Sequence, residues 1–259
     1  MSLGKFLDEF THRWIGWTFP PAFQALDLSG WKPDSASAYC ARCGDSVGVG
    51  EATVDGCSTC RVGAELEGGI GDRVVRLGPY VDELRDWILK IKYECWSEMG
   101  QALGQLLGGA VSESGAIDDP NRAIVVPMPM PWQRRLYRGI DHARVIAAAT
   151  ARELRAPLAS VLSRSHHTPQ VARAPSERKR SGGRGLRVRF QLGGWRLQGA
   201  QVLLIDDVRT TGATLKAAVR LLRPLKPQRV VCAVLGVSDS QARTIRSKRL
   251  KSMSVAELV

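Results

Sequence analysis

The chain has 259 residues and a net charge of +12, with 44% hydrophobic and 24% charged residues. This is an ordinary globular balance, and the length suffices for one large α/β domain plus a small module. No apolar run approaches the roughly eighteen residues of a membrane span, and the first residues lack the apolar segment of a signal peptide, so we expect a cytoplasmic protein. The excess of positive charge favours anionic partners, namely phosphorylated metabolites, nucleic acid or an acidic membrane surface.

The first 35 residues predict a short helix that Pro20-Pro21 ends. Its aromatic side chains recur at near-helical spacing: Phe6, Phe10, Trp14 and Trp17. Such a stripe packs on the protein's own core or faces a partner or membrane surface. Residues 29–37 are rich in Ser, Gly, Pro and Asp and predict a linker.

Four of the six cysteines form two C-x2-C pairs separated by thirteen residues: Cys40, Cys43, Cys57 and Cys60. This spacing fits tetrahedral zinc, and the few apolar residues nearby mean that the metal would supply the folding energy. Two disulfides or a redox-active C-x-x-C are the alternatives. Cys95 and Cys232 stand in apolar surroundings and are expected to be core thiols.

Between Arg73 and Tyr93 the pattern predicts a strand and then a helix. Lys90 and Lys92 near the end of this helix are expected to interact favourably with the helix dipole. A second helix is expected from Met99 to Ala110. Another buried strand is predicted at Ala123–Val126.

The rigid segment Pro127–Pro131 follows that strand and leads to a basic cluster, Arg134, Arg135 and Arg138. A helix through Ile140 and Leu154 comes next. A strand, a stiff turn, a basic cluster and a helix predict an anion-binding corner, and a solvated basic loop is the alternative.

Residues 164–189 carry eight Arg or Lys against one acid, together with three glycines. A long basic loop of this kind is functional or disordered. Short strands are expected before it, at Ser160–Leu162, and after it, as a hairpin of Val188–Phe190 with Arg196-Leu197.

The most informative stretch begins with a buried strand, Val202–Ile205, and continues into Asp206 and Asp207. A small, hydroxyl-rich turn follows, made of Thr210, Thr211, Gly212, Ala213 and Thr214, and it opens a helix. Carboxylates at a strand end suit sugar hydroxyls, and free amides at a helix start suit a phosphate. The pairing indicates a ribose 5-phosphate site; an acidic turn before an N-capped helix is the alternative. A further strand is predicted at Arg229–Leu235, and a frayed basic tail after Ser238.

This stretch resembles the signature loop of the type I phosphoribosyltransferases, which bind phosphoribosyl pyrophosphate (PRPP). The resemblance implies that Asp206 and Asp207 hold the ribose hydroxyls and act in catalysis, and that Thr210–Thr214 hold the 5-phosphate. Over residues 38–236 the order of parts is similar to the ComF family, in which a zinc ribbon precedes such a domain. The matching segments are the four cysteines, Tyr80, Ile91-Lys92-Tyr93, Val126-Pro127-Met128-Pro129, Arg138-Gly139-Ile140-Asp141, Gln170 and Arg178.

The departures from the ComF pattern are Ile91, Ile140, Asp141 and Ser181, so the sugar-phosphate loop is intact while the loops that would handle pyrophosphate differ. The resemblance implies Mg²⁺ bound with PRPP, pyrophosphate contacts from Arg134, Arg135, Arg138 and Arg178, and a link to DNA uptake. Three functions remain open: a phosphoribosyltransferase acting on an unidentified nitrogen acceptor, a PRPP or nucleotide sensor without chemistry, and an accessory factor that binds single-stranded DNA or a competence protein.

We therefore expect a mainly parallel α/β sheet flanked by helices, preceded by a zinc ribbon. The expected parts are an N-terminal helix and linker (1–37), the zinc ribbon (38–72), a phosphoribosyltransferase-like domain (73–238) and a basic tail (239–259).

Overall fold

The computed structural model describes residues 21–48, 50–51, 56–58, 60, 70–165, 185–189 and 197–239. The chain divides into two compact units, residues 1–31 and 32–259. In the first unit, helix α2 (Ala22–Ser29) begins directly after Pro21 and ends at Gly30, whose φ is 64°. The proline pair thus precedes a helix that the sequence did not predict, and the predicted aromatic helix lies outside the described residues.

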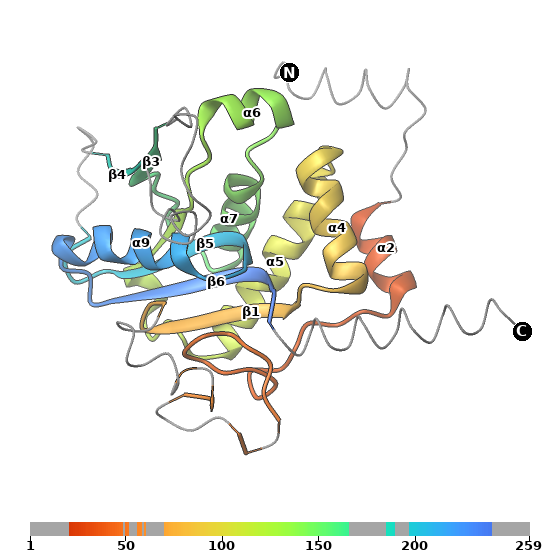
Figure 1. Cartoon of the computed structure of the whole chain (residues 1–259), viewed down its shortest axis with the longest axis horizontal. Coiled ribbons are helices and arrows are strands. Elements are labelled where there is room, and N and C mark those ends of the chain that lie inside the picture. Colours follow the sequence, from red (N-terminus) through yellow and green to blue (C-terminus); the bar gives the residue numbers. More distant parts are fainter. Residues whose placement is uncertain are drawn as a thin grey trace, which may run out of the picture. The chain divides into compact units, whose positions relative to one another are not determined.

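The second unit is built on a four-stranded parallel sheet with the order β1-β6-β5-β2. Its strands are β1 (Arg73–Pro79), β2 (Ala123–Pro127), β5 (Gln201–Arg209) and β6 (Arg229–Val237). They are runs of aliphatic residues because a parallel sheet is covered on both faces. Figure 1 shows β1, β5 and β6 side by side, with helices around them. The predicted mainly parallel sheet flanked by helices is confirmed.

Helices α4 (Asp82–Tyr93), α5 (Ser97–Glu113) and α7 (His142–Glu153) pack on the sheet and on one another, and α9 (Ala213–Leu222) packs on β5 and β6. Val202 and Leu204 join the core beneath α9. The alternate residues of β5 therefore face α7 on the other side. Helices α5 and α7 approach closely because of Gly104, where a Cβ atom would lie 2.6 Å from the Ile146 carbonyl oxygen.

Two short 3₁₀ helices, η1 (Pro120–Arg122) and η2 (Arg223–Leu225), precede β2 and follow α9. Within the described residues, no helix combines the length and the apolar character that crossing a membrane requires.

Four local predictions need correction. The basic cluster lies on a short helix, α6 (Trp132–Arg138), that the sequence did not predict. The strand expected at 160–162 is β3 (Leu162–Arg164), and it pairs antiparallel with β4 (Leu186–Val188) and not within the predicted hairpin. The central strand continues through both acids to Arg209, because parallel pairing with β6 extends that far.

The fourth correction concerns Cys95, which is exposed and donates its thiol to the Arg138 carbonyl, whereas Cys232 is buried as expected. Much of the basic loop and most of the basic tail lie outside the described residues. The first residue of the predicted tail, Asp239, is described and is 3% exposed.

Candidate functional site

A cleft of about 210 Å³ opens at the carboxyl ends of β2 and β5. Its floor is Asp206 and Asp207, and one wall is the proline-rich segment after β2. The remaining lining comes from the end of α4, from α6, from the start of α7, from β3 and from α9: Lys92, Arg134, Arg138, His142, Ala143, Arg164 and Thr214. Parallel sheets bind ligands at this edge because the strand ends and the helix starts meet there.

Asp207 is held by two basic side chains that come from different helices. Its Oδ1 lies 3.1 Å from Lys92 Nζ, and its Oδ2 lies 2.5 Å from His142 Nε2. Burial acts to raise the pKa of Asp207, but the hydrogen bond from His142 and the charge of Lys92 outweigh it and lower the pKa to about 2. Asp207 is therefore a fixed negative charge at neutral pH.

Asp206 has the opposite electrostatic environment. Burial, and then repulsion from Asp207, raise the pKa of Asp206 to about 7. Its Oδ1 accepts a hydrogen bond from the Asp207 backbone amide at 3.0 Å, which offsets only part of that effect. Two neighbouring carboxyls with pKa values pushed apart are typical of sites that do acid–base or charge-stabilising chemistry.

One side of the cleft carries three arginines, Arg134, Arg138 and Arg164. Arg138 also lies over the Tyr93 ring, 5.1 Å from its centroid, which fixes the guanidinium near the cleft. Burial and the neighbouring Arg134 lower the pKa of Arg164. Such a cluster of guanidinium groups is suited to an oxyanion such as phosphate.

The turn between β5 and α9 depends on a glycine directly before the helix. Gly212 lies directly before α9 with a φ of 72°, in the region that favours glycine. A Cβ atom there would also lie 2.6 Å from Ile70 Cδ1. The turn before it leaves Thr210 and Thr211 exposed, and the Ala213 amide donates to Thr211 Oγ1 at 3.4 Å.

The structure brings most of the predicted site residues together. Asp206, Asp207, Thr214, Arg134 and Arg138 line the cleft. Thr210, Thr211, Gly212 and Ala213 form the adjoining turn, and Arg135 lies on α6 but not in the lining. Arg178 lies outside the described residues.

Sequence reasoning missed three residues of the cleft, Lys92, His142 and Arg164. Lys92 was matched to a family segment but interpreted as a helix-dipole partner, because nothing in the local pattern points it to a carboxylate 115 positions away. His142 follows Asp141, whose side chain caps α7, so the only available signal was its place at a helix start after a basic cluster.

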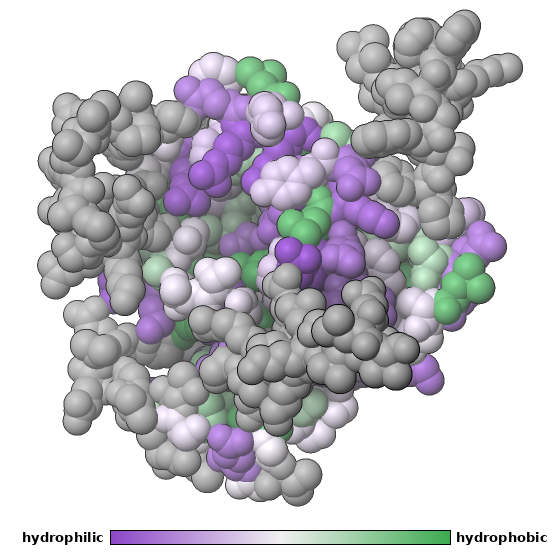
Figure 2. All heavy atoms as spheres, turned by 45° about the vertical axis from the view of Figure 1, so that its right-hand side comes forward, coloured by the Kyte–Doolittle hydropathy of each residue, from purple (hydrophilic) through white to green (hydrophobic). Residues whose placement is uncertain are grey.

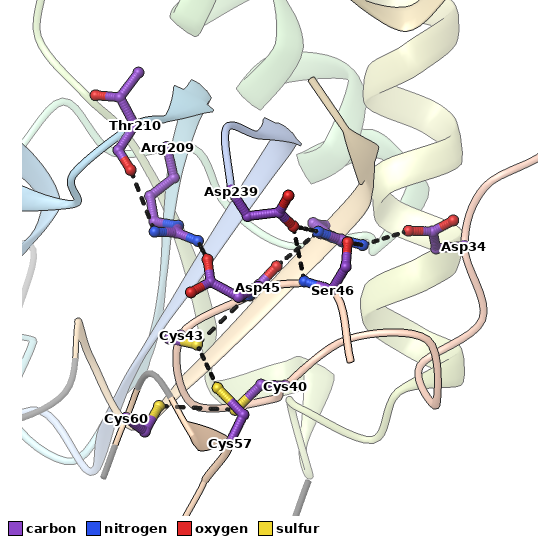
Figure 3. Close-up of polar contacts among 12 residues, drawn as sticks. Asp34, Cys40, Cys43, Asp45, Ser46, Cys57, Cys60, Arg209, Thr210 and Asp239 are labelled. Carbon is purple, nitrogen blue, oxygen red and sulfur yellow. Dashed lines mark hydrogen bonds and ion pairs between the residues drawn. The ribbon is translucent and has the colours of Figure 1, made fainter. Parts of the chain in front are cut away.

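The four cysteines meet in one cluster, with all four sulfurs within 4.8 Å of one another. The Cys40–Cys60 and Cys43–Cys57 sulfurs are 3.8 and 3.6 Å apart (Figure 3). Sulfurs bound at about 2.3 Å to a tetrahedral ion lie roughly 3.8 Å apart, whereas a disulfide needs about 2 Å. The cluster could thus hold a metal ion such as zinc, and its thiols are free.

The thiols of the cluster differ in pKa. The hydrogen bond from Cys43 lowers the pKa of Cys40 to about 4, and the same bond raises the pKa of Cys43. Burial raises the pKa of Cys60 to about 11. A cluster that already favours one thiolate is suited to a cation.

Comparison with known proteins agrees with these features. Residues 141–255 match the phosphoribosyl transferase domain family, a range that includes both aspartates and the glycine turn. Competence protein F of Haemophilus influenzae is 26% identical over 192 residues, which are 72% of this chain and 79% of that protein. The chain is thus ComF-like: it is similar to competence protein F and contains a stretch that matches the phosphoribosyl transferase domain family. The cysteine cluster of this ComF-like protein precedes the matched domain in the sequence.

Among solved structures, TT1426 from Thermus thermophilus is 19% identical with a TM-score of 0.35, over 57% of this ComF-like chain and 78% of the other. A hypoxanthine-guanine phosphoribosyltransferase from Bacillus anthracis is 16% identical with a TM-score of 0.36, over 55% and 71%.

Proposed function

We propose that this ComF-like protein binds PRPP, or another ribose 5-phosphate compound, in the cleft at the end of β5. The observation that carries the proposal is the pair Asp206 and Asp207 at the strand end, directly before a glycine turn that begins α9. The carboxylates would accept hydrogen bonds from the ribose hydroxyls. The turn from Thr210 to Thr214 would hold the 5-phosphate at the positive end of the helix.

Arginine side chains on the other side of the cleft support a pyrophosphate subsite. We assign it to Arg134, Arg138 and Arg164, with Arg135 and Arg178 as further candidates. In a transfer reaction the C1–oxygen bond breaks, pyrophosphate leaves with the bonding electrons, and a nitrogen acceptor attacks C1. The arginines would neutralise the leaving group, and the negative charge on Asp207 would offset positive charge that grows on the ring.

Magnesium fits the oxygen-rich side of this arrangement. Asp206 is the carboxylate without a basic partner at hydrogen-bond distance among the described contacts, so it is the protein oxygen that could contact Mg²⁺ or its waters. Bound with PRPP, the ion would neutralise phosphate charge.

Calorimetry with ribose 5-phosphate and with PRPP plus Mg²⁺ tests the proposal. We expect Asp206→Asn with Asp207→Asn to weaken binding at least about a hundredfold, since two charge-assisted contacts are lost. The matched control is Asp118→Asn with Asp119→Asn, an adjacent pair that does not line the cleft. Equal affinities of the two double variants would refute the site, and a pyrophosphate-release assay across candidate bases separates an enzyme from a sensor.

The cysteine cluster is proposed to bind one structural zinc ion, with residues 38–72 as the ribbon, 73–238 as the transferase-like domain and 239–259 as a basic tail. The name of the Haemophilus relative, competence protein F, supports a role in DNA uptake. Deleting the gene in its source organism should lower transformation frequency, and the double aspartate variant should fail to restore it.

A second candidate, single-stranded DNA binding, is favoured by the surface of α6. Trp132 is 61% exposed, Leu136 73% and Tyr137 87%, and Arg134 and Arg135 lie between them. Figure 2 shows hydrophilic side chains over much of the upper surface, with only small apolar patches among them. Exposed aromatics among arginines suit base stacking beside phosphate contacts.

Fluorescence anisotropy with an oligothymidine tests this candidate. We expect Trp132→Ala with Tyr137→Ala to weaken binding about tenfold or more, and affinity to fall steeply with salt. Phe23→Ala, which removes an exposed aromatic side chain from α2, is the control. A flat salt response would exclude the candidate.

A further inference from the structure

The cysteine cluster and the proposed phosphate turn are joined by a continuous set of contacts, drawn in Figure 3. The link begins at Asp45, two residues after Cys43. The Asp45 amide donates to Cys43 Sγ at 3.5 Å, and its carbonyl accepts from the Cys40 amide at 2.8 Å. The position of Asp45 is thus set by its backbone contacts with both cysteines of the first pair.

The side chain of Asp45 forms an ion pair with Arg209. Arg209 is the last residue of β5, two positions after Asp207, and its Nη1 donates to the Thr210 carbonyl at 3.2 Å. Its side chain is 8% exposed, and its Nε has no hydrogen-bond partner in the described part of the chain. A buried guanidinium in this position depends on its carboxylate, because an unpaired buried charge is strongly unfavourable.

The loop that carries Asp45 has little freedom to absorb a displacement. Gly44 lies against β1, where a Cβ atom would be 2.8 Å from Val74 Cγ1. Its carbonyl accepts from Arg76 Nη1 at 2.8 Å, and the Ser46 amide donates to Asp239 Oδ2 at 2.8 Å. A change at the cysteines is therefore passed on to the ion pair and is not lost in a flexible loop.

We infer that the Asp45–Arg209 ion pair couples metal occupancy of the cysteine cluster to the shape of the phosphate-binding turn, so that metal loss weakens binding of a ribose 5-phosphate ligand. The inference rests on the proposed function. Asp45 and Arg209 act as positioning residues, since neither lines the cleft.

Metal binding would restrain the first contact of this link. A bound metal would fix the position of the Cys43 sulfur, which accepts the Asp45 amide at 3.5 Å. When the metal leaves or the cysteines are oxidised, Asp45 loses that restraint. Arg209 then no longer holds the Thr210 carbonyl, and the turn loses its fixed conformation.

Calorimetry with ribose 5-phosphate on zinc-loaded and chelator-treated full-length protein tests the coupling. We expect zinc removal to weaken binding about tenfold in the wild type. Asp45→Asn, which keeps both backbone contacts, should weaken binding by a similar factor with zinc present, and zinc removal should then add little. Asp118→Asn, which breaks the Asp118–Arg229 pair, is the matched control and should behave as the wild type.

A reciprocal measurement gives a readout that does not depend on activity. If the two sites are coupled, ribose 5-phosphate must raise zinc affinity by the same factor, measured by competition with a chromogenic chelator. The effect should vanish in Asp45→Asn and partly return in Asp45→Glu. Circular dichroism verifies that each variant is folded.

The outcomes separate this inference from the proposed function. If the wild type binds ribose 5-phosphate equally well with and without zinc, and Asp45→Asn binds as tightly, the coupling is refuted while the site stands. If the zinc-loaded wild type does not bind ribose 5-phosphate or PRPP, the proposed function fails and the coupling fails with it.

Discussion

The cleft and the cysteine cluster are both groups of ionisable side chains, but they are stabilised in different ways. In the cleft, Asp207 is balanced by Lys92 and His142, and Asp206 lies beside it with a raised pKa. In the cluster, four thiols lie close together in a segment with few apolar residues. The cleft is thus balanced by the protein's own charges, whereas the cluster offers four sulfur ligands that could hold a cation.

The comparison shows that different interactions stabilise the two regions. The sheet beneath the cleft has an aliphatic core, which can stabilise the fold while one carboxyl of the cleft remains unfavourable. The sequence around the cysteines has few apolar residues, so a metal bound there would contribute folding free energy. Disturbing the cluster should therefore affect the fold most, and disturbing the cleft should affect mainly binding.

Zinc removal is expected to have the largest effect. Chelation, or Cys57→Ser, should lower the free energy of unfolding by ~5 kcal/mol or more, which is a fall in Tm of about 10 °C or more for a domain of this size. Elemental analysis and thermal melts measure both quantities. Cys95→Ser, at an exposed cysteine outside the cluster, is the control; a zinc content below about half an equivalent in fresh protein would contradict a tetrathiolate site.

The second-largest effect is expected at Arg76, a buried charge on β1 that donates to the Gly44 carbonyl beside the cysteine cluster. Arg76 is 1% exposed and pairs with Asp34 at 2.7 Å and Asp239 at 3.2 Å. Arg76→Met should cost about 3–5 kcal/mol in urea unfolding, because the buried carboxylate of Asp239 loses the guanidinium that balances its charge. Adding Asp239→Asn should restore part of the loss.

Arg229→Met is the control for that measurement. Its partner Asp118 is 52% exposed, so the change should cost less than about 1 kcal/mol. Equal costs for the two arginines would mean that the cluster is not anchored by a buried charge.

Removing one carboxyl from the cleft should stabilise the free protein. The pKa of Asp206 is about 7 in the fold against 3.8 for an ordinary aspartate, so the folded state retains its proton longer and stability falls as pH rises from about 4 to 7. Asp206→Asn should therefore raise the free energy of unfolding by roughly 1–3 kcal/mol at pH 8, and by little at pH 4.

Asp207→Asn should have the opposite sign. The pKa of Asp207 is lowered to about 2, so its stabilising contribution is present above about pH 4 and is lost as pH falls toward 2. Denaturant unfolding of both variants from pH 4 to 8 measures the contrast. If Asp206→Asn were destabilising at pH 8, Asp206 would not be the carboxyl whose pKa is raised in the fold.

The contrast also explains what the sequence could predict. The parallel sheet and the cluster were predictable because aliphatic runs and C-x2-C spacing report local requirements. The turn at Gly212 was predictable because its composition is local to one strand–helix junction. In contrast, the partners of Asp207 lie on two other helices, and a single sequence without pairing information does not reveal such distant contacts.

Errors in the prediction have the same cause. The strand at Asp206 and Asp207 is longer than expected because pairing with β6 extends to Arg209 and overrides the polar composition. The helix that carries the α6 arginines was not predicted, because the proline segment before them masks a seven-residue helix. The link from Asp45 to Arg209 joins positions 164 apart and has no local signature.

The smallest effect is expected at His142. Two substitutions there test whether the imidazole contributes more than its one hydrogen bond to Asp207. His142→Gln can still donate an amide N–H to Asp207, so the cost should stay below about 1.5 kcal/mol. His142→Leu removes the donor and leaves Lys92 as the remaining basic contact, so the pKa of Asp207 should rise above its value in the wild type. Carboxyl-carbon NMR titration measures that shift, with Asp118 as an internal reference in the same spectrum. An unchanged pKa of Asp207 in His142→Leu would show that Lys92 alone maintains the charge, and the cleft would then resemble a single ion pair more than a network.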